Sequence, residues 1–121
     1  MKQILLVFLG GGLGSALRHL ISKWLNTTQD NFPYGTFAVN ILGSLLIGII
    51  LGLSVKNNSL SESQTLLLAT GFCGGFTTFS AFAYENHLFL KSGDFTTFAL
   101  YTFSSFIVGF LAVFGGMYMV K

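Results

Sequence analysis

The segment GFCGGFTTFSAFAYE, from Gly71 to Glu85, interrupts a chain that otherwise has the apolar composition of membrane helices. Two adjacent glycines and two adjacent threonines are a poor combination for a helix, because glycine is too free and threonine side chains compete for backbone groups. The segment therefore predicts that a long helix is broken near Gly74–Thr78. Beyond the break, Phe79 and Phe82 are three residues apart and share one helix face.

The rest of the chain indicates a membrane protein. Of its 121 residues, 52% are hydrophobic and only 8% are charged, whereas about a quarter of the residues in soluble domains are charged. The length suits one domain, residues 1–121. A net charge of +2 is too small to indicate a nucleic-acid partner, and the single cysteine, Cys73, excludes an internal disulfide.

Four apolar stretches are long enough to cross a bilayer, which takes about 20 helical residues. Short polar segments separate them, including Asn26–Pro33, which contains the only proline. The first stretch lacks a clean signal-peptide cleavage site, so we expect it to be retained as a helix. The sequence thus predicts an all-α membrane protein with spans at Ile4–Ile21, Gly35–Val55, Ser63–Leu90 and Phe95–Val120.

The basic residues do not set an orientation for these spans. One predicted side carries Lys2, Lys56 and Lys121, and the other carries Arg18, Lys23 and Lys91. Because each side carries three basic residues, the positive-inside rule predicts no preferred orientation. Sparse charges produce such a tie by chance, but it also predicts a dual-topology protein whose two orientations pair as an antiparallel homodimer.

Small residues four apart are compatible with close helix association, although each pair alone is weak evidence of an interface. Three such pairs occur, namely Gly10 and Gly14, Gly48 and Gly52, and Gly71 and Gly75. They favour the homodimer without requiring it.

Polar side chains inside the spans are functional candidates, because burying them without partners is costly. The set comprises Arg18, Asn40, Thr77, Thr78, Ser80, Glu85, Tyr101, Thr102, Ser104 and Ser105. It contains no nucleophile with a nearby base and no cluster of metal-ligating residues, so we expect neither an enzyme nor a transition-metal protein. Glu85 is the only carboxylate available to a proton-coupled pump.

The remaining groups are mostly neutral hydrogen-bond donors, which suit an anion better than a cation. A phenylalanine ring carries partial positive charge at its edge, so Phe79 and Phe82 fit the same purpose, although most of the 14 phenylalanines are expected to pack or to face lipid. Carbonyl groups released at Gly74 and Gly75 would suit a hard monovalent cation. Alternatively, the break is only a packing kink.

Three stretches together resemble the Fluc (CrcB) fluoride channel family. They are GGGLGSALRH (Gly10–His19), GTFAVNILGSLLIG (Gly35–Gly48) and GFCGGFTTFSAFAYE (Gly71–Glu85). The resemblance covers the whole chain. It implies passive fluoride export across the cell membrane by an antiparallel dual-topology homodimer with two pores, in contact with membrane lipid.

The resemblance also implies roles for individual residues. Phe79 and Phe82 would be the pore-facing aromatic pair, and Asn40 would line the pore with its amide. The polar side of the path would come from hydroxyls of Ser80, Tyr101 and Ser105. Carbonyl groups of Gly74 and Thr77 from both subunits would hold a central structural sodium ion. Arg18 would lie in the vestibule, and Glu85 near the other pore end.

Some positions depart from the family pattern. Ala81 removes one hydroxyl near the aromatic pair, and His19 stands where tyrosine is common. Gly109 leaves the lower part of the fourth span without a hydroxyl. The intact motifs and the balanced charges favour a homodimer over a pair of unequal copies.

Two other functions fit a small four-span protein. A dual-topology multidrug exporter needs a carboxylate in its first span, and this first span has none. A non-transporting membrane subunit would not need the break, Asn40 and the aromatic pair. Fluoride selectivity itself would come from a narrow path whose donors replace the ion's water.

Overall fold

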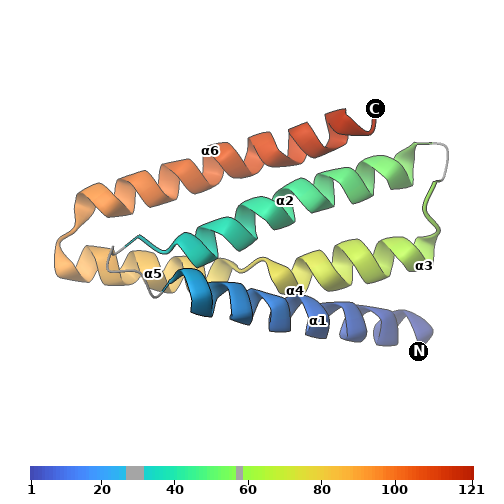
Figure 1. Ribbon diagram of the computed structural model, residues 1–121, viewed down its shortest axis with the longest axis horizontal. Helices are drawn as coiled ribbons and strands as arrows, with labels where there is room; N and C mark the ends of the chain where they lie inside the picture. The colour runs from blue at the N-terminus through green and yellow to red at the C-terminus, as the bar shows by residue number, and fades with distance from the viewer. Residues whose placement is uncertain (27–31, 57–58) are drawn as a thin grey trace.

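The computed structural model describes residues 1–26, 32–56 and 59–121, and it is an all-helical bundle. Four helical stretches run along it (Figure 1), each long and apolar enough to cross a membrane. They are α1 (Lys2–Leu25), α2 (Tyr34–Val55), a composite stretch Glu62–Ser92, and α6 (Phe95–Met119). The four predicted spans are confirmed. Parts of two predicted polar connections, residues 27–31 and 57–58, lie outside the described residues.

The composite stretch has four parts in sequence: α3 (Glu62–Thr65), the π-helix η1 (Leu66–Cys73), α4 (Gly74–Phe76) and α5 (Phe79–Ser92). It begins at a capping box, in which Ser61 Oγ accepts from the Gln64 amide at 3.1 Å and Gln64 Oε1 accepts from the Ser61 amide at 2.9 Å. A π-helix of eight residues is unusual, because such wide turns mostly occur singly and often near functional sites.

The break lies at Thr77 and Thr78, within the predicted range. Both residues have extended backbone, with ψ of 159° and 123° respectively. Gly74 itself is helical, with φ −61° and ψ −38°, so the unwound residues are the two threonines at the end of the predicted range. The threonines interrupt the helix because their side chains and a neighbouring helix compete for the backbone groups.

The glycines instead allow helices of the same chain to approach closely. A Cβ atom at Gly10 or Gly14 would collide with backbone atoms of η1, and one at Gly75 would collide with the Gly11 carbonyl. Gly48 packs in the same way against the backbone of α6 at Val113. The three small-residue pairs of the sequence are therefore used for packing inside one chain, so they are not evidence for a dimer interface.

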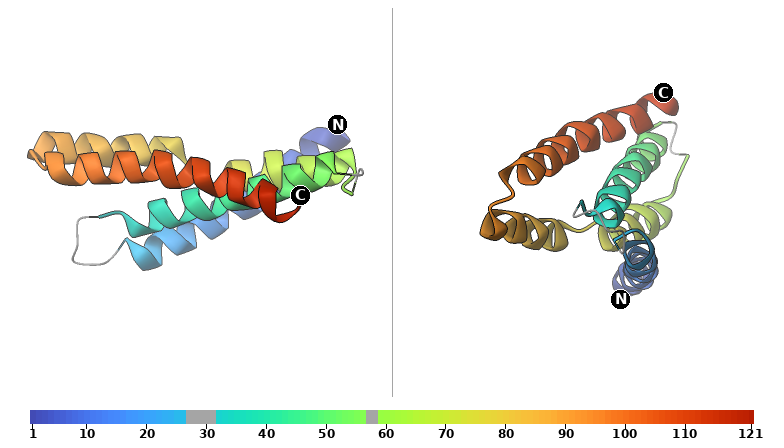
Figure 2. Two further views of the ribbon diagram at one scale, coloured as in Figure 1. Left: turned by 90° about the horizontal axis from the view of Figure 1, so that it is seen from above. Right: turned by 60° about the vertical axis from the view of Figure 1, so that its left-hand side comes forward.

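Beyond the break, α5 turns away from α1 and joins α6 at a tight connection (Figure 2). Gly93 allows this turn because its φ is +83°, and the Asp94 amide donates back to the Phe89 carbonyl at 2.9 Å. Asp94 then caps α6 by accepting from the Thr97 amide at 3.1 Å. Since α6 also packs along α2, it is held opposite the break.

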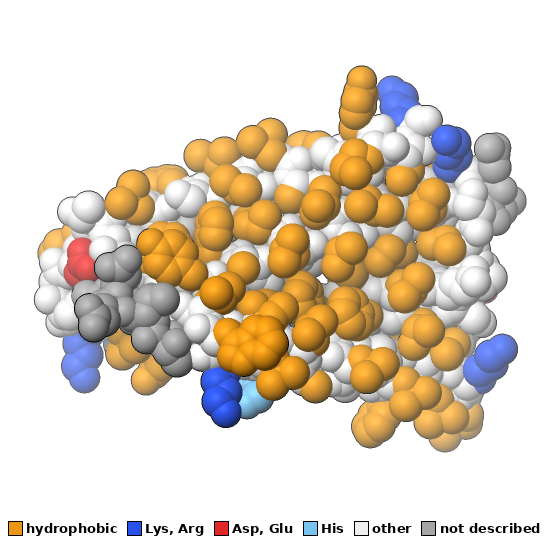
Figure 3. Space-filling model, in the orientation of Figure 1, with side chains coloured by type: hydrophobic (Ala, Val, Ile, Leu, Met, Phe, Trp, Pro, Cys, Tyr) orange, Lys and Arg blue, Asp and Glu red, His pale blue; other side chains and the backbone are white. Residues whose placement is uncertain are grey.

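The surface has the pattern of a multi-pass membrane protein. Hydrophobic side chains cover the visible face of the bundle, and the Lys and Arg side chains on that face lie towards its margins (Figure 3). The chain ends lie at the same end of the bundle (Figure 1), as an even number of crossings requires. Large apolar side chains such as Phe103, Phe110 and Phe114 are at least 63% exposed, which suits contact with lipid.

Candidate functional site

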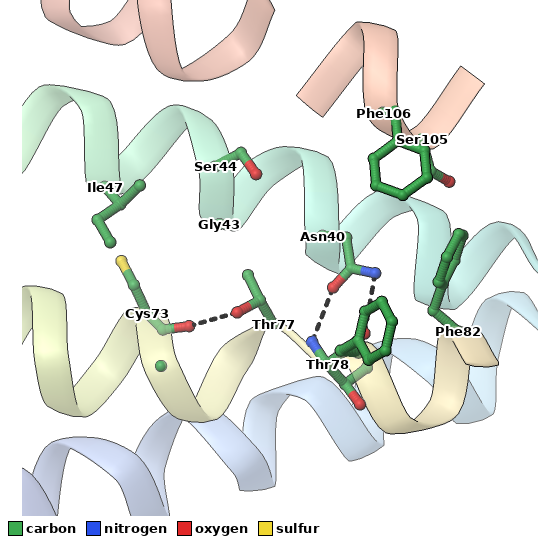
Figure 4. A pocket seen from close by; sticks show the side chains of 12 residues that line it. Asn40, Gly43, Ser44, Ile47, Cys73, Thr77, Thr78, Phe82, Ser105 and Phe106 are labelled. Atoms are coloured by element: carbon green, nitrogen blue, oxygen red, sulfur yellow. Dashed lines mark hydrogen bonds between the residues drawn. The ribbon is translucent and has the colours of Figure 1, made fainter. Parts of the chain in front are cut away.

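A groove of about 370 Å³ lies beside the break, between α2, both halves of the broken stretch and α6 (Figure 4). No acidic, basic or histidine side chain is found among the described residues that line it. The groove brings together six of the predicted site residues: Asn40, Gly74, Thr77, Phe79, Phe82 and Ser105. Its lining does not include the other four: Arg18, Ser80, Glu85 and Tyr101.

Asn40 joins α2 to the extended backbone of Thr78 by two hydrogen bonds (Figure 4). Its Nδ2 donates to the Thr78 carbonyl at 3.1 Å, and the Thr78 amide donates to Asn40 Oδ1 at 2.8 Å. A primary amide offers the same donor and acceptor as a peptide group, so it satisfies the unwound backbone as a neighbouring strand would. Sequence reasoning placed Asn40 in the pore lining but did not predict this bridge.

The two threonine hydroxyls end one helix and begin the next. Thr77 Oγ1 donates to the Cys73 carbonyl at 2.9 Å. Thr78 Oγ1 accepts from the Ala81 amide at 3.1 Å and therefore caps α5. It also lies 3.2 Å from the hydroxyl of Ser80, so Ser80 belongs to the cap and not to the groove lining.

These contacts release two backbone carbonyl groups. In a continuous helix the Gly74 carbonyl would accept from the Thr78 amide, which here donates to Asn40. In the same way the Thr77 carbonyl would accept from the Ala81 amide, which here donates to Thr78 Oγ1. Gly74 and Thr77 are the residues that sequence reasoning assigned to a sodium ion. Their carbonyl oxygens suit a hard monovalent cation, as ligand chemistry requires.

The aromatic pair stands directly after the break. Phe79 and Phe82 have ring centroids 5.9 Å apart, with planes at 43°. Phe79 is 73% exposed in the single chain, whereas Phe82 is only 8% exposed. The ring of Phe82 packs against Tyr101 at 5.0 Å and against Phe106, edge to face, at 6.0 Å. One ring is thus fixed by α6, and the other projects from the protein surface.

Tyr101 and Glu85 form a separate buried cluster with Thr36. Glu85 accepts from the Thr36 hydroxyl at 2.6 Å and from the Tyr101 hydroxyl at 2.7 Å. Tyr101 is fully buried and its ring supports Phe82 and Phe89. The cluster ties α5 to α2 and α6, so these residues position the aromatic pair. Thr36 was not predicted, although it precedes Asn40 by one helical turn on the same face.

Arg18 connects α1 to the end of α4. Its Nε donates to the Gly75 carbonyl at 3.0 Å, and Ser15 Oγ donates to the same oxygen at 3.3 Å. A cation at the C-terminal end of a helix is favourable, because the last carbonyl groups carry partial negative charge. Arg18 therefore stabilises the helix end that precedes the break.

Ser105 presents a hydroxyl that has no hydrogen-bond partner although it is buried. Ser105 forms part of the groove wall contributed by α6 (Figure 4). Sequence reasoning missed the other lining residues with polar or aromatic side chains, namely Ser44, Cys73 and Phe106. Ser44 was accessible to sequence reasoning, because it follows Asn40 by four residues on one helix.

Comparisons with known proteins show which family the chain matches. Residues 5–117 match the family model described as CrcB-like protein, Camphor Resistance (CrcB). A fluoride-specific ion channel FluC from Gloeothece citriformis is 50% identical over 122 residues, covering 100% of this chain and 98% of that protein. A protein of the same name from Bacteroides fragilis is 46% identical over 123 residues, covering 98% of this chain and 96% of its own length.

Proposed function

This chain belongs to the CrcB family, and on that basis we propose that it is a fluoride-selective channel, and not an enzyme, that releases fluoride passively across the cell membrane. The observation that carries the proposal is the groove beside the break. It offers an amide, hydroxyls and ring edges, and no ionised side chain among its described lining. Such donors replace the water of a small anion without holding it so tightly that it stays.

Three kinds of donor support passage of an anion through this groove. The Ser105 hydroxyl has no protein partner. The Phe79 amide, the first of α5, has no acceptor within its own helix and lies at the positive end of that helix. The ring edges of Phe79 and Phe82 add positive partial charge without a full charge. Together these groups would compensate fluoride for the water that it loses inside the membrane.

Purified protein in liposomes is expected to release fluoride passively down its gradient and chloride far more slowly. A fluoride electrode and a chloride electrode measure the two fluxes under the same potassium gradient with valinomycin. Equal rates for both anions would contradict selectivity. Empty liposomes and liposomes with an unrelated four-span protein serve as controls.

The same assay separates the two rival functions. A multidrug exporter would exchange protons for a cationic drug and would release no fluoride. Its chemistry needs a carboxylate in the first span, and α1 contains no Asp or Glu. A non-transporting subunit would give neither flux.

We further propose that the channel is an antiparallel dual-topology homodimer with two pores. The groove is open along the side of the single chain, and Phe79 and Gly74 beside it are exposed. A second copy would close the groove and cover these residues. The equal division of the six basic residues between the two ends agrees with insertion in both orientations.

C-terminal reporter fusions are expected to be active on both sides of the membrane, because neither orientation is favoured by charge. Additional lysines next to Lys121 should shift insertion towards the orientation that keeps them in the cytoplasm. The readout is the ratio of a cytoplasmic to a periplasmic reporter. A single orientation of the unmodified chain would contradict dual topology.

We propose a structural sodium ion at the break, held by the carbonyl groups of Gly74 and Thr77 from both subunits. Both carbonyls have lost their helical donors to Asn40 and Thr78, and Gly74 is exposed where a partner would approach. When bound, the ion would neutralise the carbonyl dipoles that the break leaves unpaired.

Exchange of sodium for a larger cation such as N-methylglucamine is expected to lower thermal stability, because an ion that binds only the folded dimer stabilises it by mass action. With sodium at about 100 times its dissociation constant, this effect is about 2.7 kcal/mol. Differential scanning fluorimetry across a sodium titration measures it. An unchanged melting temperature after exhaustive exchange would mean that the break is only a kink.

A further inference from the structure

The hydroxyl lining of α6 stops at Ser105. The residue that follows on the same face is Gly109, which has no side chain to donate. A donor one helical turn beyond Ser105, about 5.4 Å further along α6, is therefore missing from this face. The groove nevertheless continues in this direction, because Ile47 and Cys73 also line it.

Ser44 on α2 stands opposite this gap. It lines the groove one turn after Asn40, and its Oγ lies 3.9 Å from the position that a Cβ atom at Gly109 would occupy. In Figure 4 the Ser44 hydroxyl lies on the side of α2 that also carries Asn40. A serine at position 109 of α6 would therefore place its hydroxyl close to the hydroxyl of Ser44.

The Ser44 hydroxyl is also available. Serine in a helix often donates back to the carbonyl four residues earlier, which here belongs to Asn40. No hydrogen bond of the Ser44 side chain occurs among the residues that the structure describes. An uncommitted hydroxyl at a groove wall has a donor to offer a passing ion.

We propose that Ser44 is a further pore-lining residue that donates a hydrogen bond to fluoride at the level of Gly109, in place of the hydroxyl that α6 lacks. The inference rests on the proposed channel function. It makes the polar path cross from α6 at Ser105 to α2 at Ser44. Asn40 and Ser44 would then act from successive turns of one helix.

The test moves the hydroxyl from one helix to the other. Ser44→Ala is expected to lower fluoride flux in liposomes about tenfold, the effect of one lost hydrogen bond to a charged group. Adding Gly109→Ser to that variant should restore flux to within about twofold of the unmodified protein. The second change fits sterically, because the nearest atoms to a Cβ at Gly109 are 3.9 Å away.

Gly109→Ala in the Ser44→Ala background separates an ion contact from packing, because it adds bulk from α6 without a hydroxyl, and it should leave flux low. Restored flux in that double variant would mean that packing was lost and not a hydrogen-bond donor. Ser54→Ala is the matched control, because Ser54 lies on the same helix and outside the groove lining. It should conduct normally. Normal flux in Ser44→Ala, or a loss that Gly109→Ser does not repair, would overturn the proposal. If the unmodified protein releases no fluoride, the proposed channel function is wrong. That result differs from the outcomes that would overturn only the role of Ser44.

Discussion

Phe79→Ile is expected to reduce fluoride flux about a hundredfold, which corresponds to about 3 kcal/mol of lost stabilisation of the ion in its path. Isoleucine keeps apolar bulk but has no ring edge with positive partial charge. Phe79 is 73% exposed in the single chain, so the change removes little packing within the protomer. The protomer should therefore still fold, and size-exclusion chromatography reports whether it also assembles, while electrode measurements in liposomes show the loss of flux.

Phe82→Ile should lose flux to a similar extent, but it also disturbs packing. The ring is 8% exposed and lies against Tyr101, so its replacement is expected to cost about 1–2 kcal/mol of folding stability as well. Thermal unfolding of the two variants distinguishes these effects. Phe79→Ile should unfold near the temperature of the unmodified protein, and Phe82→Ile below it.

Two other phenylalanines provide matched controls for the aromatic pair. Phe8 is 74% exposed and Phe114 is 67% exposed, and neither lines the groove beside the break. Phe8→Ile and Phe114→Ile should conduct nearly normally. An equal small loss in all four variants would show that these rings only pack, and the proposed role of ring edges would then be wrong.

Asn40→Asp is expected to abolish measurable fluoride flux, for two reasons. A carboxylate places negative charge in the path of an anion. It also replaces the Nδ2 donor to the Thr78 carbonyl by an oxygen, so that two acceptors face each other across 3.1 Å. The carboxylate would keep only the Thr78 amide as a donor, which is too little for a charge inside the membrane, and the break should lose half of its bridge to α2. Flux should fall at least about a hundredfold, together with a lower melting temperature.

Asn26→Asp is the control for this change. Asn26 follows α1 and its Oδ1 accepts from the Gly35 amide at 2.7 Å, which a carboxylate also does. It should leave flux and stability nearly unchanged. Near-normal conduction by Asn40→Asp would contradict both the bridge and the assignment of Asn40 to the ion path.

The aromatic pair and the break illustrate how far sequence patterns reach. The interval of three residues placed Phe79 and Phe82 on one face, and the structure confirms that both line one groove. Glycine and threonine composition also located the break within five residues, Gly74–Thr78. Composition did not reveal which residue unwinds, because Gly75 serves close packing and Gly74 stays helical, while Asn40 and the Thr78 hydroxyl take the backbone donors.

Tyr101 shows the opposite case. The family resemblance assigned Tyr101 to the polar side of the path, and no sequence pattern indicated that its hydroxyl donates to Glu85 or that its ring is fully buried. Helical periodicity assigns residues to faces of one helix and does not say which neighbour each face meets. Only the rotation of α5 against α2 and α6 brings Thr36, Glu85 and Tyr101 together.

By itself the sequence determined the four spans, the place of the break and the neutral, donor-rich character of the polar set, because lipid permits only helices with satisfied backbones and few charges. The tertiary structure decided which glycines pack inside the chain and which polar groups remain uncommitted. Asn40 and Thr78 are separated by 38 residues, and Arg18 and Gly75 by 57. Contacts over such distances depend on how helices are rotated and spaced, which no local pattern encodes.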